Sequence, residues 1–406
     1  MPLYHTSISH KRYLMTELLV APEKTQIMEE GCTKTAYDMA MGTSQMLGCL
    51  TERLHSISEE AVLTCFGQEF NPETYAIAKA DMLIKGGNAS GMKYGDTLSD
   101  DAFSGYEFDY IISNPPFGID WKREKVQVEA EAKRGYDGRF GPGLPAISDG
   151  QMLFLLNGVK KLKEGSGRMA IIQNGSSLFT GDAGSGASEI RRFVIEGDLV
   201  DTIIQLPTDL FYNTGITTYI WVLTKGKDVC RRGKVQLIDA SKCFVKRRKN
   251  IGSKRVDLDD ACIDLILRAY EDFENETYKE DDLVVESKVF ENSFFGFTKV
   301  TVETARNDET GRPILKRGKL VPVKGKSDTE IIPLQEDIDA YMEKNVLPYN
   351  PDAYIDSAKD KIGYEVPFTR LFYKFQAPPS SNSIFEEIKA LEAEETILMK
   401  ELFGNE

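Results

Sequence analysis

Four consecutive residues, Asn114-Pro115-Pro116-Phe117, form a pattern that could activate a nitrogen atom. The side-chain oxygen of Asn114 and the carbonyl oxygen of Pro115 can both accept hydrogen bonds from one planar amino group. Two such acceptors draw the nitrogen toward tetrahedral geometry and localise its lone pair, so the nitrogen becomes a nucleophile without a strong base. Phe117 adds a flat face for a ring that carries the amino group.

The same four residues also suit a purely structural role. They follow a short buried strand predicted over Phe108 to Ile112, and two prolines end strand pairing because they cannot donate a backbone hydrogen bond. In a doubly wound sheet, however, the carboxyl end of a central strand is also the place where ligands bind. The residues alone leave a turn and a catalytic loop open.

The elements that would position this loop alternate along the first two-thirds of the chain. Apolar runs predict strands, helical spacing predicts helices between them, and Asn71 is expected to cap one of these helices. This rhythm predicts an α/β protein with a mostly parallel, doubly wound sheet. The expected strands are 35–37, 61–66, 108–112, 169–173, 200–206, 217–223 and 234–238, and the expected helices are 14–21, 46–54, 71–86, 151–162 and 190–196.

Composition limits the partners and the compartment. With 50 Lys and Arg against 64 Asp and Glu, the formal net charge is −14, which argues against a protein that grips nucleic acid with its whole surface. Six dispersed cysteines and three histidines predict no metal site. The first residues lack the pattern of a secretory signal, and no apolar run is long enough to span a bilayer. A cytoplasmic protein without membrane contact is therefore expected.

One stretch reverses the overall charge. Residues 225–255 contain 12 Lys and Arg against two Asp, and the most basic part is Lys246-Arg247-Arg248-Lys249. The residues leave two interpretations open, a solvated loop or a patch that contacts phosphates. Beyond it, residues 256–383 predict a mixed extension, and residues 384–406 an acidic helix. That helix could dock on a partner helix or pack on the core.

The chain resembles a known family at many separated blocks. The sequences FDYIISNPPFGIDW, LPTDLFYNTGITTYIWVLT and IGYEVPFTRLFYKF are similar to the modification (M) subunit of type I restriction–modification systems. The resemblance extends from about Leu14 to the C-terminus. It implies a Rossmann-like, S-adenosylmethionine-dependent methyltransferase that acts on adenine N6 in DNA.

The resemblance also implies a role for particular residues. Asn114, Pro115, Pro116 and Phe117 would form the catalytic loop, with the target adenine flipped out of the duplex and stacked on the phenyl ring. Four positions would contact S-adenosylmethionine: Glu69 at the ribose hydroxyls, Asp96 at the adenine, and Asp38 and Gly42 at the methionine end. The basic residues Lys246, Arg247, Arg248 and Lys249 would contact DNA.

The resemblance further implies an assembly. A specificity (S) subunit would choose the DNA sequence, and a restriction (R) subunit and a second M subunit would complete the complex. The methyltransferase domain would cover residues 1–255, the C-terminal extension 256–383 and a partner-docking helix 384–406. The long N-terminal helical domain of similar proteins has no counterpart in this sequence.

Two segments depart from the family pattern, and both concern the cofactor. The usual loop reads Asp-Pro-x-x-Gly-x-Gly-Gly, whereas residues 38–45 keep only Asp38 and the first glycine, Gly42. The lost glycines predict strain and extra Cβ atoms at Ser44 and Gln45. Residues 5–10 also lack the aromatic-Thr-Pro segment that covers the cofactor in similar proteins.

These departures leave three functions open. The first is an active DNA adenine methyltransferase, and the second is a truncated or diverged paralogue that only clamps DNA or supports the complex. The third is a protein-glutamine methyltransferase, which would explain only the four-residue loop.

Overall fold

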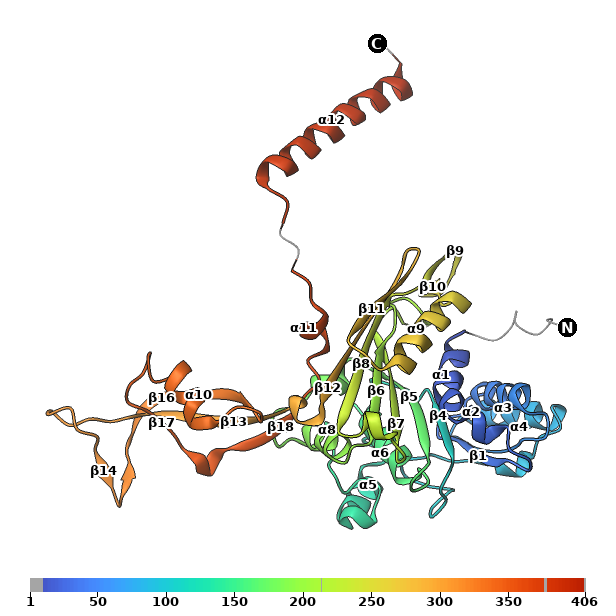
Figure 1. Ribbon diagram of the computed structural model, residues 1–406, viewed down its shortest axis with the longest axis horizontal. Coiled ribbons are helices and arrows are strands. Elements are labelled where there is room, and N and C mark those ends of the chain that lie inside the picture. The colour runs from blue at the N-terminus through green and yellow to red at the C-terminus, as the bar shows by residue number, and fades with distance from the viewer. Residues whose placement is uncertain (1–9, 213, 376–377, 405–406) are drawn as a thin grey trace. The chain divides into compact units, whose positions relative to one another are not determined.

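The computed structural model describes residues 10–212, 214–375 and 378–404. The chain divides into two units, Met1–Phe368 and Thr369–Glu406. The first unit contains a large sheet covered by helices and a separate β-rich arm (Figure 1). Within the described ranges, no helix combines the length and apolar character that crossing a membrane requires.

The large sheet has ten strands in the order β11-β12-β8-β6-β7-β5-β4-β1-β2-β3. From β3 to β5 all neighbours are parallel, β7 is antiparallel to both β5 and β6, and β8 is parallel to β6. The mostly parallel α/β sheet expected from the sequence is therefore confirmed. The strands are β1 Thr33–Asp38, β2 Val62–Glu69, β3 Met92–Tyr94, β4 Tyr110–Ser113, β5 Arg168–Asn174, β6 Val200–Gln205, β7 Thr218–Thr224, β8 Lys234–Lys242, β11 Glu276–Glu280 and β12 Leu283–Glu291.

Helices lie between these strands much as the sequence pattern indicates. Asn71 caps α4 as expected, because its side-chain oxygen accepts hydrogen bonds from the backbone N–H groups of Glu73 and Thr74, both at 3.0 Å. The helices of this part are α1 His10–Val20, α2 Lys24–Ile27, α3 Gln45–Ile57, α4 Pro72–Ile84, α5 Lys125–Ala132, α6 Gln151–Lys160, α7 Ser176–Phe179, α8 Gly186–Glu196 and α9 Asp260–Asp272, with short 3₁₀ turns at Ala21–Glu23, Ala89–Gly91, Gly135–Asp137 and Val229–Arg231.

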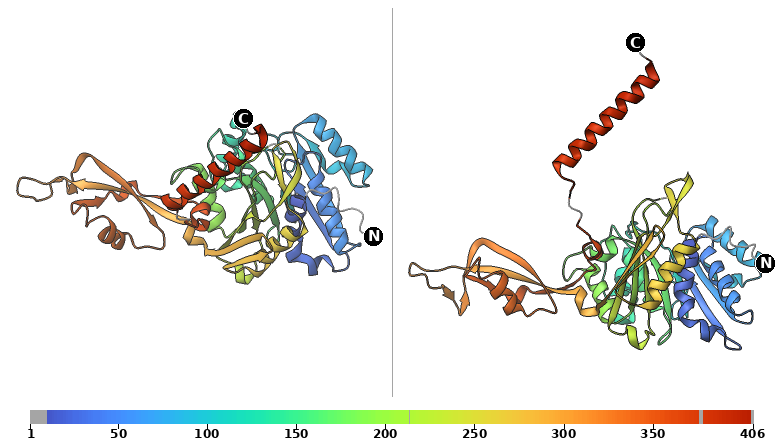
Figure 2. Two further views of the ribbon diagram at one scale, coloured as in Figure 1. Left: turned by 90° about the horizontal axis from the view of Figure 1, so that it is seen from above. Right: turned by 45° about the horizontal axis from the view of Figure 1, so that its top comes forward.

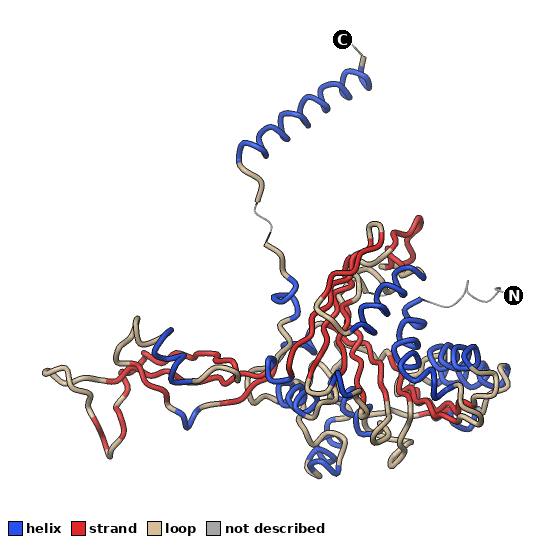
Figure 3. The backbone as a smooth tube through the Cα atoms, viewed as in Figure 1, coloured by secondary structure: helices blue, strands red, loops and turns tan. Residues whose placement is uncertain are grey.

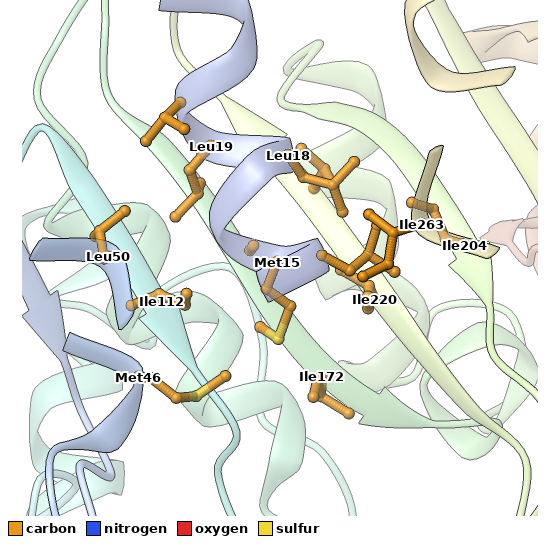
Figure 4. Packing of buried hydrophobic residues seen from close by; sticks show 14 of the residues in the cluster. Met15, Leu18, Leu19, Met46, Leu50, Ile112, Ile172, Ile204, Ile220 and Ile263 are labelled. Carbon is orange, nitrogen blue, oxygen red and sulfur yellow. The ribbon is translucent and has the colours of Figure 1, made fainter. Parts of the chain in front are cut away.

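The core lies on both faces of the sheet, because side chains alternate along each strand. On one face α1 packs beside α3 and α9, and its buried Met15, Leu18 and Leu19 meet isoleucines from the four strands β4 to β7 (Figure 4). On the other face α6 covers β5, where the close approach leaves no room for a Cβ at Gly158 against Met169. Helices on both faces hold the carboxyl edge of the sheet in a fixed arrangement.

The basic stretch forms a β-hairpin. Its strands, β9 (Val245–Ile251) and β10 (Lys254–Asp257), pair only with each other and are antiparallel. Lys246, Arg248 and Lys249 are exposed on β9, whereas Arg247 is half-buried and forms an ion pair with Asp257. The stretch is therefore an ordered hairpin, in which the two strands satisfy each other's backbone groups, and its contact with phosphates stays a prediction.

The second sheet forms an arm, defined here as residues 296–364 and called the β-arm. Its central strand β13 (Gly296–Ala305) pairs with β16 (Pro322–Pro333) on one side and with β17 (Ala353–Ile355) and β18 (Lys361–Tyr364) on the other (Figure 3). Helix α10 (Ile338–Asn345), the strands β14 (Leu315–Lys316) and β15 (Lys319–Leu320), and turns at Asn292–Phe295 and Ser357–Lys359 complete this part.

The ten-stranded sheet continues past the predicted domain boundary at residue 255. Strands β11 and β12 belong to this sheet, and α9 packs against it. The division into 1–255, 256–383 and 384–406 stays a prediction. In the second unit, α12 (Ser381–Phe403) confirms the expected C-terminal helix, and α11 (Phe368–Phe372) lies where the two units meet in sequence.

Candidate functional site

The predicted catalytic loop begins where β4 ends. Ser113 is the last residue of β4, and its hydroxyl donates a 2.7 Å hydrogen bond to the carboxylate of Asp38 at the end of the neighbouring β1. Asn114 follows at the point between β1 and β4 where the strand order reverses. Its side-chain oxygen is buried and has no hydrogen-bond partner among the described residues. A buried acceptor without a partner is rare, and it is ready to receive a donor from a ligand.

The loop opens into a cleft of about 870 Å³ at the carboxyl edge of the sheet. Most of its lining residues lie at or just after the carboxyl ends of β1 to β4, or in the connection between β4 and α6. Two further residues come from α6 and from the segment after β6, Phe154 and Phe211. The structure therefore brings six predicted site residues together. The lining comprises Met39, Ala40, Gln68–Phe70, Gly95–Leu98, Asn114–Phe117, Ile119–Trp121, Arg123, Glu124, Gly150, Phe154 and Phe211.

Glu69 lines the cleft and also holds the loop that follows β1, here called the first loop. Its two carboxylate oxygens accept hydrogen bonds from the backbone N–H groups of Gly42 at 3.0 Å and Asn71 at 2.8 Å. Each carboxylate oxygen has a second lone pair, so Glu69 keeps capacity to accept from a ligand hydroxyl. Gly42 itself does not line the cleft and contacts the site through Glu69.

Asp38 lies behind the cleft surface. Burial raises its pKa to about 7, although the hydroxyl of Ser113 and the backbone N–H of Ala40 partly oppose this by donating hydrogen bonds to the charged form. The nearby charge of Glu69 raises the pKa further. Asp38 therefore holds β1 and β4 together at the site, and its charge changes near neutral pH.

Asp96 lines the cleft after β3, and one of its oxygens is committed to the local turn. That oxygen accepts hydrogen bonds from the N–H groups of Leu98 and Ser99, both at 2.9 Å, and from the Ser99 hydroxyl at 3.0 Å. These bonds hold the carboxylate in place at the wall of the cleft. Thr97 also ties this segment to the first loop, because its hydroxyl donates to the carbonyl of Met39.

The strain predicted in the first loop is present at Ser44. Its φ of +58° lies in the left-handed region, its side chain is buried, and its hydroxyl has no partner within the described part of the chain. The side chains of Ser44 and Gln45 do not line the cleft, and the Gln45 amide instead donates to Asp81. The upstream departure at residues 5–10 falls mostly on residues 1–9, outside the described ranges.

The segment after the predicted catalytic loop is held by residues that no motif in the sequence marks. The Trp121 indole donates a 3.0 Å hydrogen bond to the carbonyl of Ala146, its backbone N–H donates to Ile147, and Gly150 donates to the carbonyl of Ile119. These three bonds fasten residues 119–121 to residues 146–150. The one signal in the sequence was the tryptophan itself, four residues after Phe117.

Two aromatic residues of the cleft were also missed, Phe154 on α6 and Phe211 after β6. Phe211 belongs to the segment Asp209–Tyr212, which the β9–β10 hairpin contacts directly. The backbone N–H groups of Ser253 and Arg255 donate to the carbonyls of Tyr212 and Asp209, each at 2.9 Å. The predicted basic residues 246–249 lie outside the cleft, but their hairpin is attached to one of its walls.

The described residues hold no group of three or more His, Cys, Asp or Glu side chains placed to bind a metal ion. The candidate site is thus a cleft with an unpartnered amide oxygen, four acidic residues (Glu69, Asp96, Asp120 and Glu124) and several aromatic rings.

The fold and the cleft define a class, the Rossmann-like α/β proteins of the methyltransferase type. The family model for N-6 DNA methylases matches residues 15–310, and the chain belongs to this family.

Its relatives agree with this assignment. A type I restriction enzyme methylase subunit (MjaIX) of Methanocaldococcus jannaschii is 27% identical over 317 residues, which cover 76% of this chain and 51% of the relative. The HindI methylase subunit of Haemophilus influenzae is 30% identical over 217 residues, covering 52% and 46%. The chain spans about half the length of the curated relatives it matches.

Two solved structures show the same fold. The type I restriction-modification methyltransferase subunit of Streptococcus thermophilus is 28% identical, with a TM-score of 0.56 over 70% of this chain and 55% of that one. The type I enzyme EcoKI M protein, 17% identical, has a TM-score of 0.51 over 100% of this chain and 74% of that one, which supports the fold alone.

Proposed function

We propose that this chain transfers a methyl group from S-adenosylmethionine to adenine N6 in DNA, as part of a modification subunit of a type I restriction–modification system. The single observation that carries the proposal is the buried, unpartnered side-chain oxygen of Asn114 at the wall of the cleft. A ligand amino group that donated to this oxygen and to the Pro115 carbonyl would be held between two acceptors. Phe117, which is half-buried beside the core, would stack on the base.

The cleft suits the nucleoside part of the cofactor. Glu69 and Asp96 supply anchored carboxylates for hydroxyl and amino groups, while Phe70 and Leu98 add apolar surface for a ring. A volume of about 870 Å³ is within the range of small-molecule sites. When bound, the cofactor supplies an electrophilic methyl group on sulfur, and the chain's residues align the acceptor nitrogen with it.

The β9–β10 hairpin supports a DNA substrate. Lys246, Arg248 and Lys249 are exposed, and the hairpin is hydrogen-bonded to the segment that carries Phe211 into the cleft. Phosphates held by these cations would therefore lie beside the base pocket. Changing Lys246, Arg247 and Arg248 to Glu should weaken duplex binding at all sequences and flatten its salt dependence.

We further propose the partners that type I systems imply: a specificity subunit that selects the DNA sequence, a restriction subunit, and a second modification subunit. Helix α12 is the proposed docking element for one of them, because its apolar positions follow 4-3 spacing. A DNA substrate would place the protein in the cytoplasm.

The test is transfer of tritiated methyl groups to DNA by the complex with its specificity subunit. Asn114→Ala should reduce transfer by at least a hundredfold, about 2.7 kcal/mol of transition-state stabilisation. Asn345→Ala, at the end of α10 and outside the cleft, is the matched control and should leave transfer unchanged. Digestion of the product should release N6-methyladenine, whereas a methylated glutamine and unmodified DNA would contradict the proposal.

One observation favours a second candidate, a non-catalytic subunit that clamps DNA. Ser44 is strained where similar proteins carry glycine, and this strain lies in the loop expected to hold the methionine end of the cofactor. Titration calorimetry separates the two candidates. Binding of S-adenosylmethionine at low micromolar Kd supports the enzyme, while no binding together with no transfer supports the clamp.

A further inference from the structure

A second basic hairpin lies on the β-arm, far in sequence from β9 and β10. Residues 306–326 contain seven Lys and Arg and only two acidic residues, in a protein whose net charge is −14. All seven cations are exposed: Arg306, Arg312, Lys316, Arg317, Lys319, Lys324 and Lys326. None of them forms an ion pair within the described part of the chain, in contrast to Arg247 and Lys254 of the β9–β10 hairpin.

The β-arm presents these cations on an ordered support. Strand β13 has ten residues, which corresponds to a length of ~33 Å, and β14 and β15 lie at the end of the arm remote from the ten-stranded sheet (Figures 1 and 2). The arm has its own small core around Val300, Val302 and Ile332. At its base, Arg191 of α8 donates to the Tyr364 carbonyl at 2.6 Å.

The β14–β15 hairpin itself is fixed by several bonds. Arg306 donates its backbone N–H to Val321, and Ile314 donates to Arg306, at 2.8 and 2.7 Å. Arg317 and Gly318 have φ values of +54° and +78°, which close a tight turn of the hairpin type. Because the backbone is already ordered, these cations would lose little backbone entropy on binding.

We propose that the β14–β15 hairpin is a second contact with the phosphate backbone of duplex DNA, outside the base that the cleft receives. A duplex matches the surface because it carries one negative charge per about 1.7 Å, so it offers a partner to every cation along an extended hairpin. Protein partners usually require apolar anchors at the centre of an interface. The exposed large apolar residues of the β-arm are scattered along the sequence, at Leu315, Ile331, Leu334 and Tyr349, and of these Leu315 alone lies in the β14–β15 hairpin. This inference rests on the proposed DNA substrate.

The experiment measures binding of the full chain to a fluorescent duplex of mixed sequence by anisotropy, without cofactor, across a series of salt concentrations. The variant, called the hairpin variant, changes Lys316 and Lys319 of the β14–β15 hairpin, and Lys324 and Lys326 of the adjoining strand β16, to Gln. The matched control removes the same total charge at exposed lysines elsewhere: Lys24, Lys93, Lys279 and Lys400 to Gln. A third variant, the Arg variant, changes the four lysines of the hairpin variant to Arg.

Each phosphate contact contributes about 0.9 to the slope of log Kd against log salt. We expect the hairpin variant to lower that slope by about 2 to 4 and to weaken binding at least tenfold at low salt. The control should change the slope and the Kd much less, and the Arg variant should bind like the parent. If the hairpin variant and the control bind equally, or if the parent chain binds no duplex at low salt, the inference is wrong.

The result is independent of methyl transfer. Loss of transfer in Asn114→Ala tests the cleft, whereas the anisotropy experiment contains no cofactor and reports only backbone contacts. A chain that binds DNA through the hairpin but transfers no methyl group would support this inference and contradict the proposed activity.

Discussion

Ser44→Gly is the substitution whose effect can be worked out most completely from the structure. Ser44 has a φ of +58°, which costs a non-glycine residue about 1–2 kcal/mol. Its hydroxyl is buried and has no partner within the described residues, which costs about 1–3 kcal/mol. Its side chain makes no capping bond to α3, so the substitution removes no such bond.

Glycine opposes this gain through the unfolded chain, where its greater freedom costs about 0.5–1 kcal/mol. The net expectation is that Ser44→Gly raises the free energy of unfolding by about 1–4.5 kcal/mol. The assay is thermal unfolding followed by circular dichroism, and it should show a higher Tm. If the strain also distorts the loop that would hold the cofactor, titration calorimetry should show tighter binding of S-adenosylmethionine in the variant.

Arg317→Gly separates the two contributions. Arg317 has a φ of +54° in an exposed hairpin, so this variant relieves backbone strain without removing a buried hydroxyl. It should stabilise the protein less than Ser44→Gly does. An unchanged or lower Tm for Ser44→Gly would refute the reasoning, because it would mean that the loop tolerates serine in this conformation at no cost.

Three further predictions concern residues around the cleft. Asp38→Asn should flatten the pH dependence of stability. Burial raises the pKa of Asp38 to about 7 in the folded protein, so between pH 4 and pH 7 the carboxyl ionises first in the unfolded chain and the wild type loses up to about 4 kcal/mol of its free energy of unfolding. Urea titrations at several pH values should show this loss only in the wild type. Trp121→Phe removes the hydrogen bond to Ala146 and should lower the free energy of unfolding by about 1 kcal/mol, seen as a lower Tm. If residues 119–121 position the predicted catalytic loop, the rate of methyl transfer should fall by more than this loss of stability explains. Arg139→Met removes the 2.6 Å ion pair with Glu131, which is partly exposed, and the hydrogen bonds to the carbonyls of the buried residues Thr97 and Leu98. It should lower the free energy of unfolding by about 1–3 kcal/mol in urea titrations, and an unchanged value would contradict the importance of these bonds.

The sequence predicted the parallel sheet because its information is local. Apolar runs such as residues 200–206 and the capping residue Asn71 act through neighbours in the chain, and both expectations are confirmed. The hairpin at residues 246–249 was left open between a loop and a patch, since charge alone does not report whether two polar strands will pair. The pairing of β12 with β8 was missed because it joins segments about 50 residues apart.

The candidate site shows the same division. The residues Asn114 to Phe117 could be identified from their types and their order, because two prolines and an amide define a rigid loop wherever they occur. The sequence could not show that the Asn114 oxygen is buried without a partner, since that depends on every neighbour of the loop in space. Phe211 was missed for a similar reason, because it enters the cleft from the segment that follows β6, and β7 and β5 separate β6 from β4 in the sheet.

The sequence by itself determined which chemical groups are available. These are two hydrogen-bond acceptors and an aromatic ring after a buried strand, acidic residues at the ends of two other strands, and clustered cations in an acidic chain. Tertiary structure decided which of these groups meet. It placed Glu69, Asp96 and the predicted catalytic loop around one cleft, placed Asp38 behind the wall of that cleft, and strained the backbone of Ser44. The physical reason is that residue type fixes what a group can donate or accept, whereas burial, pKa and unsatisfied bonding are properties of its surroundings.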